Sequence, residues 1–115
     1  MRIGNTAFCV FLAVGWLLTL YVSVHAISTM GAGAAGQVFF GDMSHPWRAQ
    51  FNTDFAMHLL LVAAWMIYRS KSWVVGLICG VLAINLGAVF TFGYLLVAAL
   101  RAKGDMRKVL LGARA

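Results

Sequence analysis

Three long apolar runs, separated by short polar stretches, predict three membrane-spanning helices. The runs cover residues 6–27, 51–68 and 73–100, and the last contains no charged side chain. A helix rises about 1.5 Å per residue and the hydrocarbon of a bilayer is about 30 Å thick, so one span takes about 20 apolar residues. The third run would be about 42 Å long, too long for one upright span and too short for two. We therefore expect it to tilt or to project past the headgroups.

The pattern predicts an all-α integral membrane protein, with residues 1–115 forming a single three-helix transmembrane unit. A loop over residues 28–50 begins with small and glycine residues and ends in a turn, where Pro46 restrains His45 to an extended backbone. The link between the second and third helices is so short that these helices must be antiparallel neighbours. Residues 101–115 form a basic C-terminal tail.

Composition agrees with a membrane protein. The chain is 63% hydrophobic and only 10% charged, against about 25% charged residues in an ordinary soluble domain. Its net charge of +6 has no accompanying platform of aromatic and basic residues, so the charge indicates membrane flanks and not nucleic-acid binding. Cys9 and Cys79 fall inside predicted spans and form no disulfide or zinc pattern.

The first apolar run could be a signal peptide, but it exceeds the usual 7 to 15 residues of such signals, and we expect a retained helix. Three spans would place Arg2, Arg69 and Lys71 on one side of the membrane. The other side would carry more basic residues, and this excess predicts a cytoplasmic C-terminal tail at a bacterial inner membrane. Those residues are Arg48, Arg101, Lys103, Arg107, Lys108 and Arg114.

The same topology predicts a polar cluster, because the second helix begins on the side where the first and third helices end. One hypothesis is a ligand-binding or proton-handling site. The other, which we favour, is structural: Asn52 or Thr53 caps the second helix, and Asp54 complements its dipole. Asp54 would then pair with Arg101 or Arg48. The candidate cluster consists of His25, Asp54, His58, Tyr94 and Arg101.

His58 lies one helical turn beyond Asp54 and is a weak candidate for ligating a tetrapyrrole metal, with Asp54 orienting the ring. A hydrogen-bonded packing histidine is the favoured alternative. We predict no other metal ligand. The acidic residues are only Asp42, Asp54 and Asp105, so the chain offers few residues that could act as a general acid or base.

The third predicted helix carries small residues at helical spacing, which allow close backbone approach in lipid. Gly76 and Gly80 form a G-x-x-x-G pair, and Ala83 and Gly87 extend this ridge. Asn85 should form a hydrogen bond with a neighbouring helix. Whether the ridge receives a helix of this chain or of another protein stays open.

Several short motifs together resemble a family of small three-helix membrane proteins that is catalogued only as a domain of unknown function, in bacteria and plants. The resemblance covers about residues 46–100. It implies the three-helix architecture and no particular activity. The motifs are PWRAQFNTDF, AAWMIYRSKSW, GLICGVLAINLG and the late Tyr94 before LLVAAL.

We therefore expect a small non-catalytic accessory or assembly subunit that packs against a larger electron-transfer or light-harvesting membrane complex and contacts lipids. The alternative is a membrane binding module for a lipid, quinone, carotenoid or tetrapyrrole. A small membrane enzyme or transporter is the least favoured class. No cofactor is required by the sequence, although a carotenoid or a tetrapyrrole would fit the alternative.

Overall fold

A computed structural model describes residues 3–115, with side chains from Asn5 onward; Arg2, counted above for orientation, lies outside the described residues. Every element of this part of the chain is a helix. The elements are α1 (Ile3–Met30), α2 (Ala34–Gly41), a 3-10 turn η1 (Asp42–Ser44), α3 (Pro46–Arg69), α4 (Trp73–Leu86), α5 (Ala88–Ala102), α6 (Met106–Leu111) and a second 3-10 turn η2 (Gly112–Arg114).

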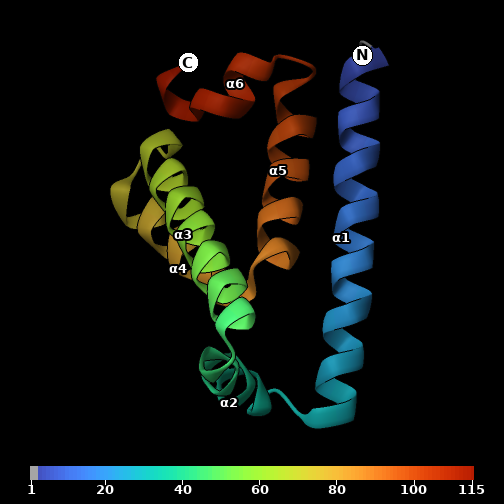
Figure 1. Ribbon diagram of the computed structural model, residues 1–115. Coiled ribbons are helices and arrows are strands. Elements are labelled where there is room, and N and C mark those ends of the chain that lie inside the picture. The colour runs from blue at the N-terminus through green and yellow to red at the C-terminus, as the bar shows by residue number, and fades with distance from the viewer. Residues whose placement is uncertain (1–2) are drawn as a thin grey trace.

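The chain runs twice between the two ends of the molecule. In Figure 1, α1 descends from the N-terminus, α2 turns the chain at the bottom, and α3 climbs back toward the top. Next, α4 descends only part of the way before α5 returns upward, and α6 crosses the top beside the N-terminal end of α1. The start of α1, the C-terminus, the end of α3 and the end of α5 therefore lie at one end, called here the α6 end.

The single long helix predicted over residues 73–100 is wrong, because the chain reverses at Gly87. Gly87 has φ 62° and ψ −137°, a conformation that is essentially confined to glycine. The reversal separates α4, about 21 Å long, from α5, about 22 Å long. The excess length noted in the sequence is thus absorbed by a helical hairpin and not by a tilted span.

The loop predicted over residues 28–50 is also corrected. It contains α2 and η1, and α3 begins at Pro46 instead of residue 51. Proline is well suited to the first turn of a helix, where its missing N–H has no partner to lose. His45 has the expected extended backbone, φ −96° and ψ 119°, and its ring accepts a hydrogen bond from the Arg48 backbone N–H. His45, and not Asn52 or Thr53, is therefore the cap.

Two pairs of helices make most of the packing contacts. In the first pair, α4 lies against α3, and the small residues of the predicted ridge form the contact. A Cβ added at Gly76 would lie 2.7 Å from the Cα of Ile67, and one at Gly80 would lie 3.1 Å from the Cβ of Ala63. The ridge thus receives the preceding helix of the same chain, while Gly87 leaves it to form the reversal.

The second pair is α1 and α5, closed at the α6 end by α6. Leu12, Ala99 and Val109 are almost fully buried and contact one another across these three helices. Phe11 of α1 and Phe92 of α5 extend this contact, with ring centroids 5.5 Å apart. The C-terminal residues, predicted as a tail, are therefore part of the packed structure.

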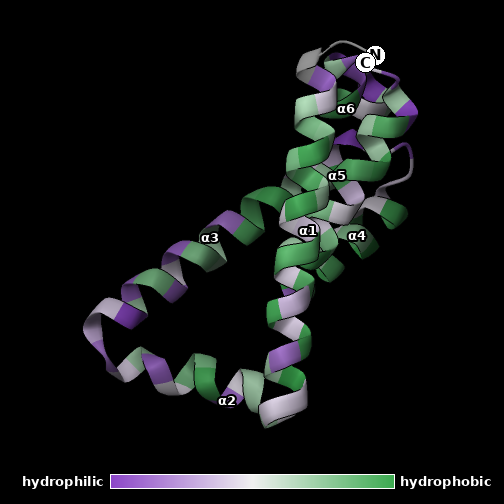
Figure 2. Ribbon diagram, turned by 90° about the vertical axis from the view of Figure 1, so that its right-hand side faces the viewer, coloured by the Kyte–Doolittle hydropathy of each residue, from purple (hydrophilic) through white to green (hydrophobic). Residues whose placement is uncertain are grey.

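Two helices are long and apolar enough to cross a membrane, α1 over Asn5–Met30 and α3. Both α4 and α5 are apolar but shorter, so three spans are not confirmed. Figure 2 shows that the N-terminal half of α3 runs obliquely away from α1 and α5, and that α2 connects its start to the end of α1. This half of α3 contains the acid and the histidine that the sequence singled out.

Candidate functional site

The five residues of the predicted polar cluster do not come together. Asp54 and His58 lie in the N-terminal half of α3, whereas Tyr94 and Arg101 lie on α5, which ends beside α6 at the opposite end (Figure 1). The reversal at Gly87 is the cause, because it returns α5 toward the N-terminus instead of carrying it to the start of α3. The expected pairing of Asp54 with Arg101 is therefore wrong.

Asp54 and His58 contact each other. The His58 Nδ1 lies 2.8 Å from the Asp54 backbone oxygen and 3.6 Å from the carboxylate oxygen Oδ1. A carbonyl can only accept a hydrogen bond, so Nδ1 is the donor of this bond, and Nε2 has no partner among the described residues. Both side chains are exposed, His58 by 70% and Asp54 by 58%. The pair forms an exposed polar patch at the start of the apolar part of α3.

His25, the fifth member of the cluster, lies near the end of α1. Its ring stacks on Tyr21, with centroids 6.4 Å apart, and both residues are exposed. This stack involves none of the other four candidates.

Arg69, at the end of α3, makes the contacts that hold the α6 end together, and sequence reasoning counted it only as an interface charge. Its Nη1 donates to the Tyr94 hydroxyl at 2.6 Å and its Nε donates to the Val109 carbonyl at 3.0 Å. Its guanidinium also lies 5.5 Å from the centre of the Trp65 ring and 5.2 Å from that of Tyr94. The sequence signal was the i, i+4 spacing of Trp65 and Arg69.

These contacts satisfy the open end of α6. The last carbonyls of a helix have no partner inside it, and they form the negative end of its dipole. Arg69 donates to two of them, the carbonyls of Lys108 and Val109, and the Trp65 Nε1 donates to the Leu110 carbonyl at 2.8 Å. At its other end α6 is capped by Asp105, whose carboxylate accepts from two backbone N–H groups.

Two further hydrogen bonds fix the same end. The Arg114 Nε donates to the Tyr68 carbonyl at 2.8 Å, and the Asn5 Nδ2 donates to the Gly104 carbonyl at 2.7 Å. The first bond caps α3 as Arg69 caps α6, and the second ties α1 to the turn between α5 and α6. Segments far apart in sequence therefore meet here through side chain to backbone bonds.

A cavity of about 880 Å³ lies beside Arg69, between α1, α5 and α6. Tyr94 and Arg101, two of the predicted site residues, both line it. Trp16 of α1 and Phe90 of α5 line its other parts. The cavity thus brings together two of the five sequence candidates, both from α5.

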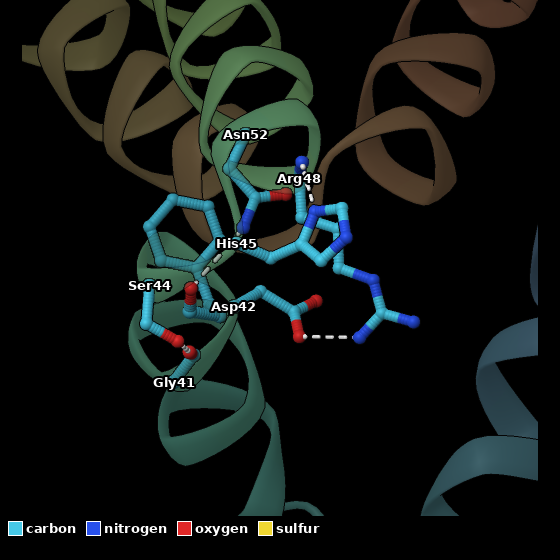
Figure 3. A network of polar contacts seen from close by, with 7 residues as sticks. Gly41, Asp42, Ser44, His45, Arg48 and Asn52 are labelled. Atoms are coloured by element: carbon cyan, nitrogen blue, oxygen red, sulfur yellow. Dashed lines mark hydrogen bonds and ion pairs between the residues drawn. The ribbon is translucent and has the colours of Figure 1, made fainter.

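A second polar network lies at the opposite end, where α2 meets α3. Figure 3 shows the Asp42 carboxylate facing the Arg48 guanidinium, with 3.1 Å between Oδ1 and Nη1. The Asn52 Nδ2 donates to the Phe39 carbonyl at 3.1 Å. Arg48 is thus paired with Asp42 and not with Asp54, and the network fixes the angle between α2 and α3.

A smaller cavity of about 540 Å³ lies between the end of α1, α2 and the reversal at Gly87. Its lining is apolar except for small polar groups such as Ser23 and Asn85. The Asn85 Nδ2 donates to the Val81 carbonyl at 2.8 Å within its own helix, so the predicted bond to a neighbouring helix is wrong. Among the residues that the structure describes, no three His, Cys, Asp or Glu side chains gather as metal ligands would.

Fold and site together define an all-α protein with two helices of membrane-spanning length and a hydrogen-bonded cap at one end. The chain belongs to the family described as "Protein of unknown function (DUF1475)", which it matches over residues 8–113. The resemblance seen over residues 46–100 is thereby confirmed and covers almost the whole chain. No curated protein and no solved structure matches it.

Proposed function

We propose that the chain is an integral membrane protein in which α1 and α3 cross the bilayer and the α4–α5 hairpin enters it and returns. The accessible surface of 8,075 Å² supports this, since a compact soluble protein of 12.5 kDa would expose about 6,200 Å². Only 6% of the most apolar stretch of α1 is buried within the chain. Lipid is the medium that accepts so much apolar surface.

The distribution of basic residues supports one orientation. Arg48 lies at the α2 end, and the other basic residues of the described chain gather at the α6 end. By the positive-inside rule the α6 end faces the cytoplasm, at a bacterial inner membrane. The C-terminal residues are then cytoplasmic, as the sequence predicted, but the start of α1 lies on the same side. The α6-end residues are Arg69, Lys71, Arg101, Lys103, Arg107, Lys108 and Arg114.

Within the membrane the chain acts as a non-catalytic accessory subunit that packs against a larger membrane protein. One observation carries this proposal: the exposed Asp54–His58 pair on the part of α3 that runs obliquely away from α1 and α5. Measured along the axis of α3 from Tyr68, His58 lies about 15 Å and Asp54 about 21 Å away. Because α3 runs obliquely to α1 (Figure 2), both residues lie at smaller depths below the membrane edge, within the hydrocarbon.

Polar groups at that depth favour a protein neighbour over lipid. A charged side chain near the centre of a span costs about 2.5 to 3.5 kcal/mol in insertion measurements, and such residues almost always face protein or water. Here the only partner that each side chain has within the described residues is the other. The fitting partner is a transmembrane helix that offers a hydrogen-bonding side chain to the His58 Nε2 or to the Asp54 carboxylate. The class of complex, electron-transfer or light-harvesting, stays a prediction.

A site-specific crosslink tests this proposal. A photoreactive side chain at Leu61, which is exposed and two turns from Asp54 on the same face, should crosslink in native membranes to a helix of a different membrane protein. The double variant Asp54→Leu/His58→Leu should lose that product, because it replaces the polar patch by apolar surface.

Asn85→Leu is the matched control, because it also removes an exposed polar group from an apolar helix and should leave the crosslink intact. Crosslinking only to lipid, or to a second copy of this chain, would overturn the accessory role. Equal loss in both variants would show that the crosslink does not depend on the Asp54–His58 pair.

A second candidate function is tetrapyrrole binding at His58. The hydrogen bond from Nδ1 to the Asp54 carbonyl is the arrangement that fixes a ligating imidazole and directs Nε2 outward. Protein purified in mild detergent would then show a tetrapyrrole absorption band, and His58→Ala would remove it. A spectrum without any such band in the wild type contradicts this function and leaves the accessory role standing.

A further inference from the structure

The cavity between α1, α5 and α6 is polar at one end and apolar at the other. Arg69, Arg101 and Lys108 line it at the α6 end, and Trp16, Val89 and Phe90 line it farther along. Phe90 and Arg101 lie eleven positions apart on α5, which separates the two ends by about 16 Å. The cavity is open on one side, and its volume of about 880 Å³ is comparable to that of sites that bind small organic molecules.

The basic end of the cavity carries three cationic side chains. No Asp or Glu side chain lines the cavity, and Ala115, the last residue, lines it without an ion pair to any of these cations among the described residues. The ion pairs of the described residues are Arg48–Asp42 and His58–Asp54, both elsewhere. Arg69 donates only to neutral acceptors, the Tyr94 hydroxyl and backbone carbonyls. The Arg101 guanidinium and the Lys108 ammonium make no hydrogen bond or ion pair within residues 5–115. An anion bound there could therefore pair with two cations that have no other partner.

We propose that this cavity binds an anionic phospholipid, with the phosphate headgroup at Arg101 and Lys108 and an acyl chain along Trp16 and Phe90. Arginine and lysine are the side chains that bind phosphate groups, arginine by paired hydrogen bonds. The aromatic end offers apolar surface that a free phosphate ion could not use. The orientation also fits the proposed membrane position, since the cations lie at the headgroup level and the aromatic rings lie deeper.

Native mass spectrometry of the full chain in mixed micelles of phosphatidylglycerol and phosphatidylcholine tests the site. The wild type should retain phosphatidylglycerol in preference to phosphatidylcholine. Arg101→Gln/Lys108→Gln should bind phosphatidylglycerol at least about 10-fold more weakly, because it removes the charge-assisted hydrogen bonds to the phosphate.

The matched control is Lys103→Gln/Arg107→Gln. It changes the net charge equally at the same end of the molecule, but neither residue lines the cavity. Its affinity should stay within about twofold of the wild type, because charges outside the cavity act on the lipid only through screening solvent. A second variant, Ala98→Phe, keeps every charge and places a ring in the cavity, so it should also lose the lipid. Because this variant leaves the cations in place, it separates the cavity from surface charge.

Equal losses in the two charge variants would overturn the proposal, because surface charge alone would then explain binding. Retention of phosphatidylglycerol by Ala98→Phe would overturn the location. Displacement of the lipid by inorganic phosphate at comparable concentration would assign the site to a free anion instead of a lipid. Equal retention of both lipids by the wild type would contradict the proposed recognition of an anionic headgroup by Arg101 and Lys108.

Discussion

Arg69 donates a hydrogen bond to the hydroxyl of Tyr94 over 2.6 Å, joining the last residue of α3 to the middle of α5. In a continuous helix over residues 73–100, Tyr94 would lie far from Arg69. The two residues meet because the chain reverses at Gly87. The same guanidinium holds the carbonyl groups at the end of α6. Arg69 therefore connects three helices and forms one wall of the cavity that we assign to lipid.

Arg69→Gln should loosen the α6 end. The substitution removes a cation and most of its donors, and hydrogen bonds to charged groups contribute about 1.5 to 3 kcal/mol each. Amide hydrogen exchange over residues 106–111 should accelerate roughly 10- to 100-fold. Arg69→Lys, which keeps the charge but lacks the planar fork of donors, should give an intermediate rate. Unchanged exchange in Arg69→Gln would show that α6 is held by apolar packing alone.

Gly112→Ala should disturb the same end from the other side. Gly112 has a φ of 55°, and a Cβ there would overlap the backbone oxygen of Arg69. Strain of this kind costs about 1 to 3 kcal/mol, so α6 should again exchange faster. Gly36→Ala serves as the control, because a Cβ at Gly36 has no neighbour within 4 Å, and it should leave the exchange rate unchanged.

The ridge on α4 predicts an order of effects. Gly76→Ala places a Cβ 2.7 Å from the backbone Cα of Ile67, whereas Gly80→Ala places one 3.1 Å from the side chain of Ala63. Overpacking costs about 1 to 3 kcal/mol, and a backbone atom moves less readily than a side chain to relieve a clash. Unfolding titrations in denaturing detergent should find Gly76→Ala the less stable variant. The reverse order would mean that α3 and α4 do not pack at this register.

Gly87→Ala should destabilise the α4–α5 reversal by about 1 to 3 kcal/mol, because an L side chain is strained at φ 62°. The bond between Arg69 and Tyr94 depends on this reversal. Tryptophan fluorescence reports it directly, since Trp65 packs edge-on against Tyr94 with ring centroids 6.1 Å apart. An unchanged emission spectrum together with unchanged stability would contradict the role assigned to Gly87.

Hydropathy predicted the helical class and the ranges of α1 and α3 to within a few residues, because long apolar runs leave few other structures in a membrane. It failed at Gly87, which was assigned to the small-residue ridge with Gly76 and Gly80. The sequence does not distinguish a glycine in a helix-packing ridge from a glycine at a chain reversal. Only the backbone angles of the structure do so. The unusual length of the run over residues 73–100 was the available signal.

That one error rearranged the predicted site. Because α5 returns toward the α6 end, Tyr94 and Arg101 lie near Arg69 and not near Asp54. Asp54 and His58 pair with each other instead. The α6 cap could not be found from hydropathy, because its bonds run from Arg69, Trp65 and Arg114 to backbone carbonyls. Every residue supplies such carbonyls, so they leave no mark in a sequence.

The sidedness of two engineered cysteines tests the central claim, that α4 and α5 form a hairpin returning to the α6 end. In a background with Cys9→Ala and Cys79→Ala, Lys71→Cys and Lys103→Cys should react with an impermeant thiol reagent from the same face of sealed membrane vesicles. Ser44→Cys, beside α2, should react from the opposite face. Labelling of positions 71 and 103 from opposite faces would restore a continuous third span and contradict the fold described here.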